Sequence, residues 1–523
     1  MAQTWSCSHA DWTLLKKESS LMPHKFTLQD MDNKIRTAQY AVRGAVPARA
    51  GELQAKLKAG EKLPFDRLVF CNIGNPHAVG QKPITFYRQV AAAVTDPSLL
   101  TAGIYPEDVK KRATEYLAAT NNAGSGAYTD SSGLLLVRQQ VAEFLLRRDG
   151  FPSEPKDIYL TTGASEGVKR AISALIKDER CGMLIPRPQY PLYSAALTMV
   201  GGRIVYYDMF EEKGWKTTYE ELNQAANDAF TDGIKLRAMT VINPGNPVGA
   251  VLDREDVVML INFATEQKLV ILADEVYQEN VYREGKQFHS FKKVLRELQK
   301  DDPVAYKQLR KNRRVDELRP AASSQDTQLI SFHSTSKGII GECGQRGGYM
   351  EYVGFSDQVL TQFTKMAATS LSSNTLGQIF VGLMVNPPKP GDPSHELFEK
   401  ETSAIFQGLT RRALRMTEAL NKVPGISSQP IDGAMYAFPS VQLPKKAIEE
   451  AKQKEQEPDG LWCLQLLEKT GIVTVPGSGF GQKEGSFHFR TTILPPDELL
   501  EEVITKLTTF QEDFMKTYGG GGY

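Results

Sequence analysis

The 523-residue sequence has few of the features that mark secreted, zinc-binding or membrane proteins. Its five cysteines are an odd number and show no Cys-x-x-Cys spacing, so a disulfide framework or zinc ribbon is not expected and a reducing compartment is favoured. No apolar run approaches the roughly 20 residues that a membrane helix needs. The 62 Lys and Arg balance 62 Asp and Glu, so the basic excess required for binding nucleic acid or an anionic membrane is missing.

Targeting and metal-binding signals are also missing. The N-terminus has no signal-peptide core, and Asp11, Glu18 and Asp30 break the acid-poor pattern of an organelle transit peptide. We therefore expect a cytoplasmic protein, with a short mitochondrial presequence left open. There is no His-Glu-x-x-His, Walker A or metal-ligand cluster, so no metal site is predicted. What is present is the composition of an ordinary globular protein, with 41% hydrophobic and 24% charged residues.

Strand and helix signals alternate through the middle of the chain. This alternation predicts right-handed βαβ units and a mainly parallel sheet, in which ligands bind beyond the carboxyl ends of the strands. A short strand is also expected early, at 68–73, and a helix follows it. The main strands are expected at 158–162, 181–185, 203–207, 238–242, 269–273 and 329–332, with helices at 134–146, 163–176 and 257–266.

Two segments interrupt the alternation. Residues 286–327 are rich in charge, and we interpret them as a solvated surface excursion. Residues 387–394 contain four prolines within Pro-Pro-Lys-Pro-Gly-Asp-Pro-Ser and are interpreted as a loop or linker. The following helical patterns, including 396–420 and a final helix to about 517, suggest a second, smaller domain.

Polar side chains follow three of the expected strands. Lys337 comes just after a strand among Ser and Thr residues, and an amine there can form a Schiff base if its surroundings make it nucleophilic. Asp274 ends a strand that looks buried, where a carboxylate needs a positive partner, and Tyr277 follows three residues later. Asn246 ends another strand. Taken singly, the lysine would be an exposed cation and the asparagine a turn residue. Together, they match what pyridoxal phosphate requires.

Four segments with this chemistry resemble the fold-type I, class I/II aminotransferases, nearest to the alanine aminotransferase branch. The resemblance covers roughly residues 30–515. The segments are 186–193 (PRPQYPLY), 243–249 (NPGNPVG), 274–282 (DEVYQENVY) and 332–344 (FHSTSKGIIGECG).

The resemblance implies a role at the cofactor ring for each strand-end residue. Lys337 would form the Schiff base with pyridoxal 5′-phosphate and carry the proton that moves during transamination. Asp274 would keep the pyridine nitrogen protonated, so that the ring acts as an electron sink. Tyr277 and Asn246 would contact the ring hydroxyl, and Tyr190 would stack on the ring face; without the resemblance, Tyr190 would be interpreted as a core tyrosine.

Further residues would bind the cofactor phosphate. Ala164 and Ser165 open an expected helix after a strand, where free backbone N–H groups and the helix dipole favour an anion. By the resemblance, Ser334 and Arg346 would complete this phosphate site. Tyr128 would reach the phosphate of a neighbouring subunit, which implies a homodimer with shared sites.

The substrate is expected to meet a strand near the C-terminus. The alternation in 486–490 (SFHFR) directs Arg490 to one strand face, and its guanidinium suits an α-carboxylate, although such an arginine alone could also be a surface ion-pair partner. Gly74 could let the backbone approach the same carboxylate. Asn246 is assigned to the substrate as well as to the cofactor.

The overall expectation is an α/β fold with a mostly parallel, seven-stranded sheet in a large domain and a smaller α/β domain. An arm would cover 1–39, the large domain 105–385, and the small domain 40–104 together with 386–523. The implied reaction is L-alanine + 2-oxoglutarate to pyruvate + L-glutamate by a ping-pong mechanism. The partners would be small amino acids and 2-oxo acids, without nucleic acid or membrane.

Three alternatives stand beside this expectation. Glutamate:glyoxylate aminotransferases would carry the same residues. The segment 163–167 (GASEG) also fits Gly-x-Ser-x-Gly between a strand and a helix, which would make Ser165 the nucleophile of an α/β-hydrolase. A non-catalytic regulator with the aminotransferase fold is disfavoured by intact Lys337, Asp274 and Arg490.

Overall fold

The computed structural model describes residues 25–40, 44–300 and 327–519. Its centre is a seven-stranded sheet in the order β2-β8-β7-β6-β5-β3-β4, in which only β8 runs antiparallel to its neighbours. Strands β6, β7 and β8 are buried along their whole length, because helices cover both faces of the sheet. The strands are β2 (Ile158–Thr161), β3 (Cys181–Arg187), β4 (Arg203–Asp208), β5 (Lys235–Ile242), β6 (Val270–Asp274), β7 (Leu329–Ser334) and β8 (Gly348–Val353).

Side chains alternate between the two faces of the sheet and enter different cores. On one face, Tyr159, Ile330 and Met350 pack with helices α7 (Ala164–Leu175), α8 (Leu192–Met199) and α13 (Asp357–Ala368). On the other, Leu160 and Leu329 pack with two groups of helices. These are α4 (Thr85–Thr95), α5 (Glu107–Ala119), α6 (Leu135–Asp149) and α14 (Thr375–Val385) in one group, and α9 (Tyr219–Thr231), α10 (Arg254–Gln267) and α11 (Phe291–Lys300) in the other.

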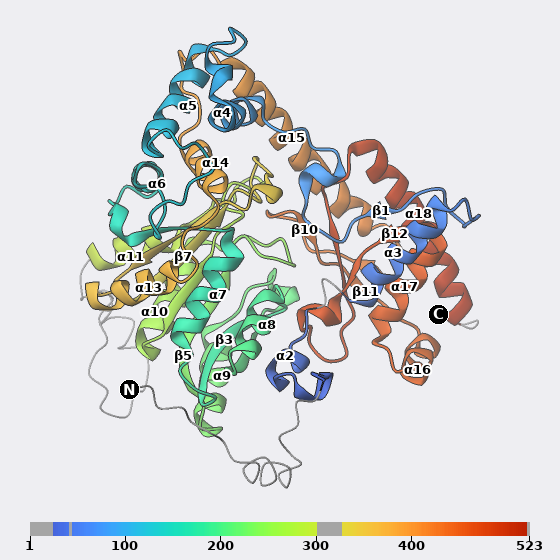
Figure 1. Ribbon diagram of the computed structural model, residues 1–523. Coiled ribbons are helices and arrows are strands. Elements are labelled where there is room, and N and C mark those ends of the chain that lie inside the picture. Colours follow the sequence, from blue (N-terminus) through green and yellow to red (C-terminus); the bar gives the residue numbers. More distant parts are fainter. Residues whose placement is uncertain (1–24, 41–43, 301–326, 520–523) are drawn as a thin grey trace, which may run out of the picture.

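A second set of elements lies beside the sheet and carries the C-terminal helix (Figure 1). Its strands are short: β1 (Val69–Phe70), β9 (Ile426–Ser427), β10 (Tyr436–Ala437), β11 (Ser440–Val441), β12 (Ile472–Val473), β13 (Val475–Pro476) and β14 (Phe489–Thr492). Its helices are α3 (Ala45–Lys58), α16 (Lys445–Gln453), α17 (Pro458–Thr470) and α18 (Asp497–Gly519), while the short α2 (Asn33–Thr37) packs on α8. One core joins these strands and long helices.

The 26-residue helix α15 (His395–Leu420) connects the two sets of elements. Near its start, Phe398 belongs to the core around α4 and α14, and further along, Leu409 and Met416 belong to the core of the second set. Figure 1 shows it running from α4 and α5 to the neighbourhood of α18. The division into domains at residues 39, 104 and 385 stays a prediction.

Most expected elements form close to their predicted positions, with two differences among the strands. The strand expected at 68–73 is limited to Val69–Phe70, which pairs in parallel with β12. Strand β8 was not expected, although its residues Gly348–Val353 are fully buried. Among the described residues, no helix has the length and apolar character needed to cross a membrane.

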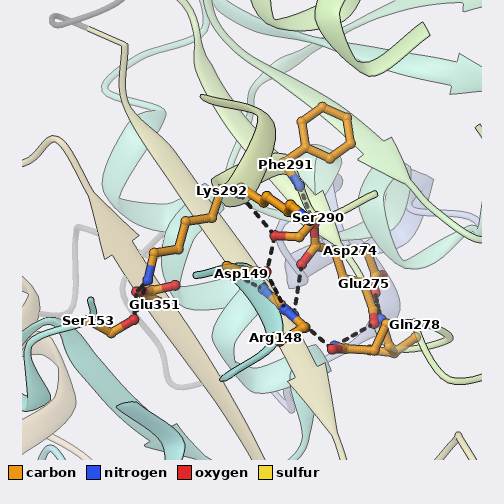
Figure 2. A network of polar contacts seen from close by, with 12 residues as sticks. Arg148, Asp149, Ser153, Asp274, Glu275, Gln278, Ser290, Phe291, Lys292 and Glu351 are labelled. Atoms are coloured by element: carbon orange, nitrogen blue, oxygen red, sulfur yellow. Dashed lines mark hydrogen bonds and ion pairs between the residues drawn. The ribbon is translucent and has the colours of Figure 1, made fainter. Parts of the chain in front are cut away.

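The interpretation of 286–327 as a solvated excursion is wrong for its first part. Residues 291–300 form α11, which buries Phe291, Val294 and Leu295 in the core beneath the sheet. Lys292 is also buried, because its amine pairs with Glu351 of β8 at 2.7 Å (Figure 2). The high charge of this segment wrongly suggested exposure, because a lysine can be buried when it forms an ion pair. Residues 301–326 lie outside the described part.

Candidate active site

A cavity of about 560 Å³ lies at the carboxyl ends of β5, β6 and β7. This is the edge at which a parallel sheet is expected to bind ligands. Eleven of the twelve residues predicted for the site line this cavity: Gly74, Ala164, Ser165, Tyr190, Asn246, Asp274, Tyr277, Ser334, Lys337, Arg346 and Arg490. The twelfth, Tyr128, has 77% of its surface exposed and does not line the cavity of its own chain.

Lys337 enters the cavity from the turn that follows β7. Its amine donates a 2.6 Å hydrogen bond to the carbonyl oxygen of Gly74. Glycine leaves room at position 74, because a Cβ there would lie within 3.0 Å of both the Lys337 amine and the Tyr436 hydroxyl. The early segment after β1 therefore lies directly against the lysine.

Asp274 is the last residue of β6, and its carboxylate is buried. It accepts hydrogen bonds from the Tyr193 hydroxyl at 2.8 Å and from the backbone N–H of Val276 at 3.4 Å. Burial raises the pKa of Asp274 to about 6, although the Tyr193 hydrogen bond, the Val276 N–H and the positive charge of Lys337 oppose the rise. A carboxylate in this setting is suited to a positively charged ligand atom.

The neighbouring carboxylate, Glu275, belongs to a different environment. It accepts a 2.9 Å hydrogen bond from the backbone N–H of Phe291 and lies 3.6 Å from Arg148. Arg148 in turn contacts Asp149 and Gln278 (Figure 2). Glu275 does not line the cavity, so the two consecutive acids serve different parts of the molecule.

The start of α7 is arranged to hold an anion. Gly163 has a φ of +76° and turns the chain after β2, so that Ala164 and Ser165 present the first N–H groups of the helix. The guanidinium of Arg346 lies across this helix end and donates to Thr162 O at 3.2 Å and to Ser165 Oγ at 3.3 Å. A helix N-terminus and a guanidinium thus face the same point.

Arg490 lies on β14 with 2% of its surface exposed. Its Nη1 donates to Asn246 Oδ1 at 3.0 Å, and its Nη2 donates to the carbonyl of Asn72. Its buried Nε has no hydrogen-bond partner among the described residues. A buried guanidinium with a free donor, held by neutral acceptors, is an anion-binding group.

Several residues that line the cavity or support it were not found from the sequence. Tyr436, on β10, places its ring 4.2 Å from the Arg490 guanidinium. Tyr40 lies close to Tyr190, and their hydroxyls are 2.8 Å apart. Tyr193 gave a usable signal, since it stands three residues after Tyr190 at the start of a helix, whereas Tyr436 stands in an apolar segment that looks like ordinary core.

The comparisons with known proteins agree with this geometry. The family model for aminotransferase class I and II matches residues 94–507. A probable mitochondrial alanine aminotransferase from Dictyostelium discoideum is 46% identical over 95% of this chain and 91% of the relative. Glutamate–glyoxylate aminotransferase 2 from Arabidopsis thaliana is 45% identical over 94% of this chain and 96% of the relative. Human alanine aminotransferase 1 is also 45% identical, over 94% of this chain and 96% of the relative.

A solved structure supports the fold. The alanine aminotransferase from Pyrococcus furiosus aligns with a TM-score of 0.70 at 24% identity, covering 92% of this chain and all of that one. The family match overturns the hydrolase alternative. In agreement, the hydroxyl of Ser165 accepts a hydrogen bond from the Arg346 guanidinium. The chain therefore belongs to the class I and II aminotransferases, enzymes that depend on pyridoxal 5′-phosphate.

Proposed function

We propose that this enzyme catalyses L-alanine + 2-oxoglutarate ⇌ pyruvate + L-glutamate. The observation that carries the proposal is that Lys337, Asp274, Arg490 and the anion site at the start of α7 all face one cavity. The substrates are inferred from the Dictyostelium discoideum and human alanine aminotransferases, which are similar along nearly the whole chain.

The residues present fit pyridoxal 5′-phosphate. The start of α7, with Ser165 and Arg346, would hold its phosphate, and Ser334 at the end of β7 lines the same cavity. Asp274 would balance the charge of a protonated pyridine nitrogen, because its hydrogen-bond donors in the protein are neutral. Tyr277 and Asn246 would face the ring hydroxyl, and Tyr190 the ring. When bound, the cofactor supplies an electron sink for the charge left at the substrate Cα.

The chain itself supplies binding and proton transfer. Arg490 would bind the substrate α-carboxylate through its free Nε and neighbouring Nη, with Gly74 and Asn246 beside it. The Nζ of Lys337 would remove the proton from the substrate Cα as a general base. Its hydrogen bond to Gly74 O places the amine beside the backbone that we assign to the substrate carboxylate.

A screen of amino-donor and keto-acceptor pairs tests this proposal. We expect a higher kcat/KM for alanine with 2-oxoglutarate than for glutamate with glyoxylate, and no turnover by Lys337→Ala. Arg490→Ala should raise KM for both amino and keto acids, since both carry an α-carboxylate. Turnover of glutamate with glyoxylate but not of alanine with 2-oxoglutarate would exclude the proposed substrates.

That second candidate has its own support. The Arabidopsis thaliana glutamate–glyoxylate aminotransferases 1 and 2 are each 45% identical to this chain, as is human alanine aminotransferase 1. The screen distinguishes the two activities through alanine and glyoxylate, because glutamate takes part in both reactions.

We further propose a homodimer in which Tyr128 reaches the phosphate site of the partner chain. The exposure of Tyr128 outside its own cavity supports this arrangement. The proposed compartment is the cytoplasm, with mitochondria as the second candidate because two of the relatives are named mitochondrial. Fractionation of cells expressing the full chain would distinguish the two.

A further inference from the structure

Tyr436 stands where the carboxylate-binding arginine and the reacting lysine meet. It lies on β10, which pairs with β14, so its backbone is two positions away in register from Arg490. Its side chain has 3% of its surface exposed and lines the cavity. None of the roles assigned above uses it.

The ring of Tyr436 contacts the guanidinium of Arg490. The guanidinium carbon lies 4.2 Å from the centroid of this ring and 4.8 Å from that of Phe480. A guanidinium held between aromatic rings is stabilised by cation–π attraction, which is strongest when the group is desolvated. The ring therefore helps to fix the orientation of Arg490.

The hydroxyl of Tyr436 lies at the other end of the same side chain, near the lysine. It and the Lys337 amine both lie within 3.0 Å of one point, the position that a Cβ on residue 74 would take. The Tyr277 hydroxyl donates to it at 3.4 Å. The Tyr436 side chain thus has its ring against Arg490 and its hydroxyl near the Lys337 amine.

The electrostatics of the phenol agree with this placement. Burial alone would raise the pKa of Tyr436, but the positive charges of Lys337 and Arg490, with the hydrogen bond from Tyr277, lower it below its usual value. Tyr277 shows the opposite direction, and its burial raises its pKa. The Tyr436 oxygen therefore accepts the hydrogen bond from Tyr277, and it lies where the positive charges of Lys337 and Arg490 both act on it.

We propose that Tyr436 is a positioning residue that couples the two ends of the reaction site, its ring orienting Arg490 for the substrate carboxylate and its hydroxyl stabilising positive charge at the Lys337 nitrogen. The inference rests on the proposed function, in which Arg490 binds the carboxylate and Lys337 holds the cofactor.

Two substitutions separate the two contributions. Tyr436→Phe keeps the ring and removes the hydroxyl. We expect the pH midpoint of the cofactor's visible absorption to shift down by about one unit, because positive charge near Lys337 loses a stabilising oxygen. Affinity for propionate, an unreactive carboxylate, should change by less than about twofold. Tyr436→Met removes the ring and should weaken propionate binding by roughly tenfold.

The controls use another buried tyrosine. The hydroxyl of Tyr207 donates to Thr240 O at 2.8 Å, and Tyr207 does not line the active-site cavity. Tyr207→Phe should leave both the spectroscopic midpoint and propionate affinity unchanged. Urea unfolding of each variant shows whether it is folded, and Tyr436→Phe provides a test even if Tyr436→Met fails to fold.

The outcomes distinguish this inference from the function on which it rests. An unchanged midpoint in Tyr436→Phe would overturn the role of the hydroxyl, and wild-type propionate affinity in folded Tyr436→Met would overturn the role of the ring. If Arg490→Ala also binds propionate normally, or Lys337→Ala keeps the visible absorption, the proposed function itself is wrong.

Discussion

Burial of the Asp274 carboxylate in the active site lowers the stability of the folded protein. Burial raises the pKa of Asp274 from an ordinary 3.8 to about 6, so between these values the folded chain binds more protons than the unfolded chain. Stability therefore falls as pH rises through this window, by an amount that reaches about 3 kcal/mol above pH 6. The hydrogen bond from the Tyr193 hydroxyl reduces this loss of stability but does not remove it.

This sign predicts the behaviour of Asp274→Asn in cofactor-free protein. At pH 8 the variant should be more stable than wild type by up to about 3 kcal/mol, and near pH 4 the gain should disappear. Urea unfolding at the two pH values measures it, with exposed Asp232→Asn as the control. With pyridoxal phosphate bound the order should reverse, because the asparagine loses the charge pair. A pH-independent effect would contradict the assigned cause.

At the scale of the element, the start of α7 depends on a backbone conformation. Gly163 and Gly150 have φ values of +76° and +77°, but only at Gly163 would a Cβ meet the Arg346 guanidinium. Gly163→Ala should therefore weaken pyridoxal phosphate binding at least about tenfold, whereas Gly150→Ala should cost about 1–2 kcal/mol of stability at most and leave affinity unchanged. Fluorescence titration measures the affinity. Equal losses in both variants would assign the effect to general strain.

Helix α11 makes a second prediction at this scale. Lys292 and Glu351 are 1% and 3% exposed and form an ion pair, in which Ser153 also donates to Glu351 at 2.7 Å. Lys292→Met should destabilise the fold by about 3–5 kcal/mol, because it leaves a buried carboxylate without its cation. Adding Glu351→Gln should recover part of this loss. Urea unfolding gives both values, and Lys293→Met on the same helix is the control.

If Lys292→Met and its double variant with Glu351→Gln were equally unstable, the loss of stability would come from lost packing and not from the unpaired charge.

The elements also show what the sequence could and could not predict. Lys337, Asp274 and Asn246 were predictable because each ends or follows a strand of the sheet, and parallel strands bring their carboxyl ends to one edge. Strand β8 was missed because the charged Glu351 interrupts its apolar run, and the Lys292 that lets this residue be buried is far away in the sequence. Tyr436 was missed because the segment 434–438 is apolar throughout and its role depends on pairing with β14. Helix α11 was missed because the partner of Lys292 lies 59 residues away.

At the scale of the whole molecule, the proposed dimer makes Tyr128 and Lys337 act in different chains. The variants Tyr128→Ala and Lys337→Ala should each be impaired as homodimers, the first in cofactor affinity by about ten- to a hundredfold, as expected for a lost hydrogen bond to a charged group, and the second in turnover.

A hybrid of the two chains should regain one complete site. In that site, the Tyr128→Ala chain would supply Lys337 and the partner chain would supply the intact Tyr128, because the proposed contact crosses the interface. Purification through two different affinity tags gives the hybrid, and its activity at low pyridoxal phosphate should approach half that of wild type. If Tyr128 served its own chain, neither site of the hybrid would be complete, and activity at low cofactor would stay at the level of the variants.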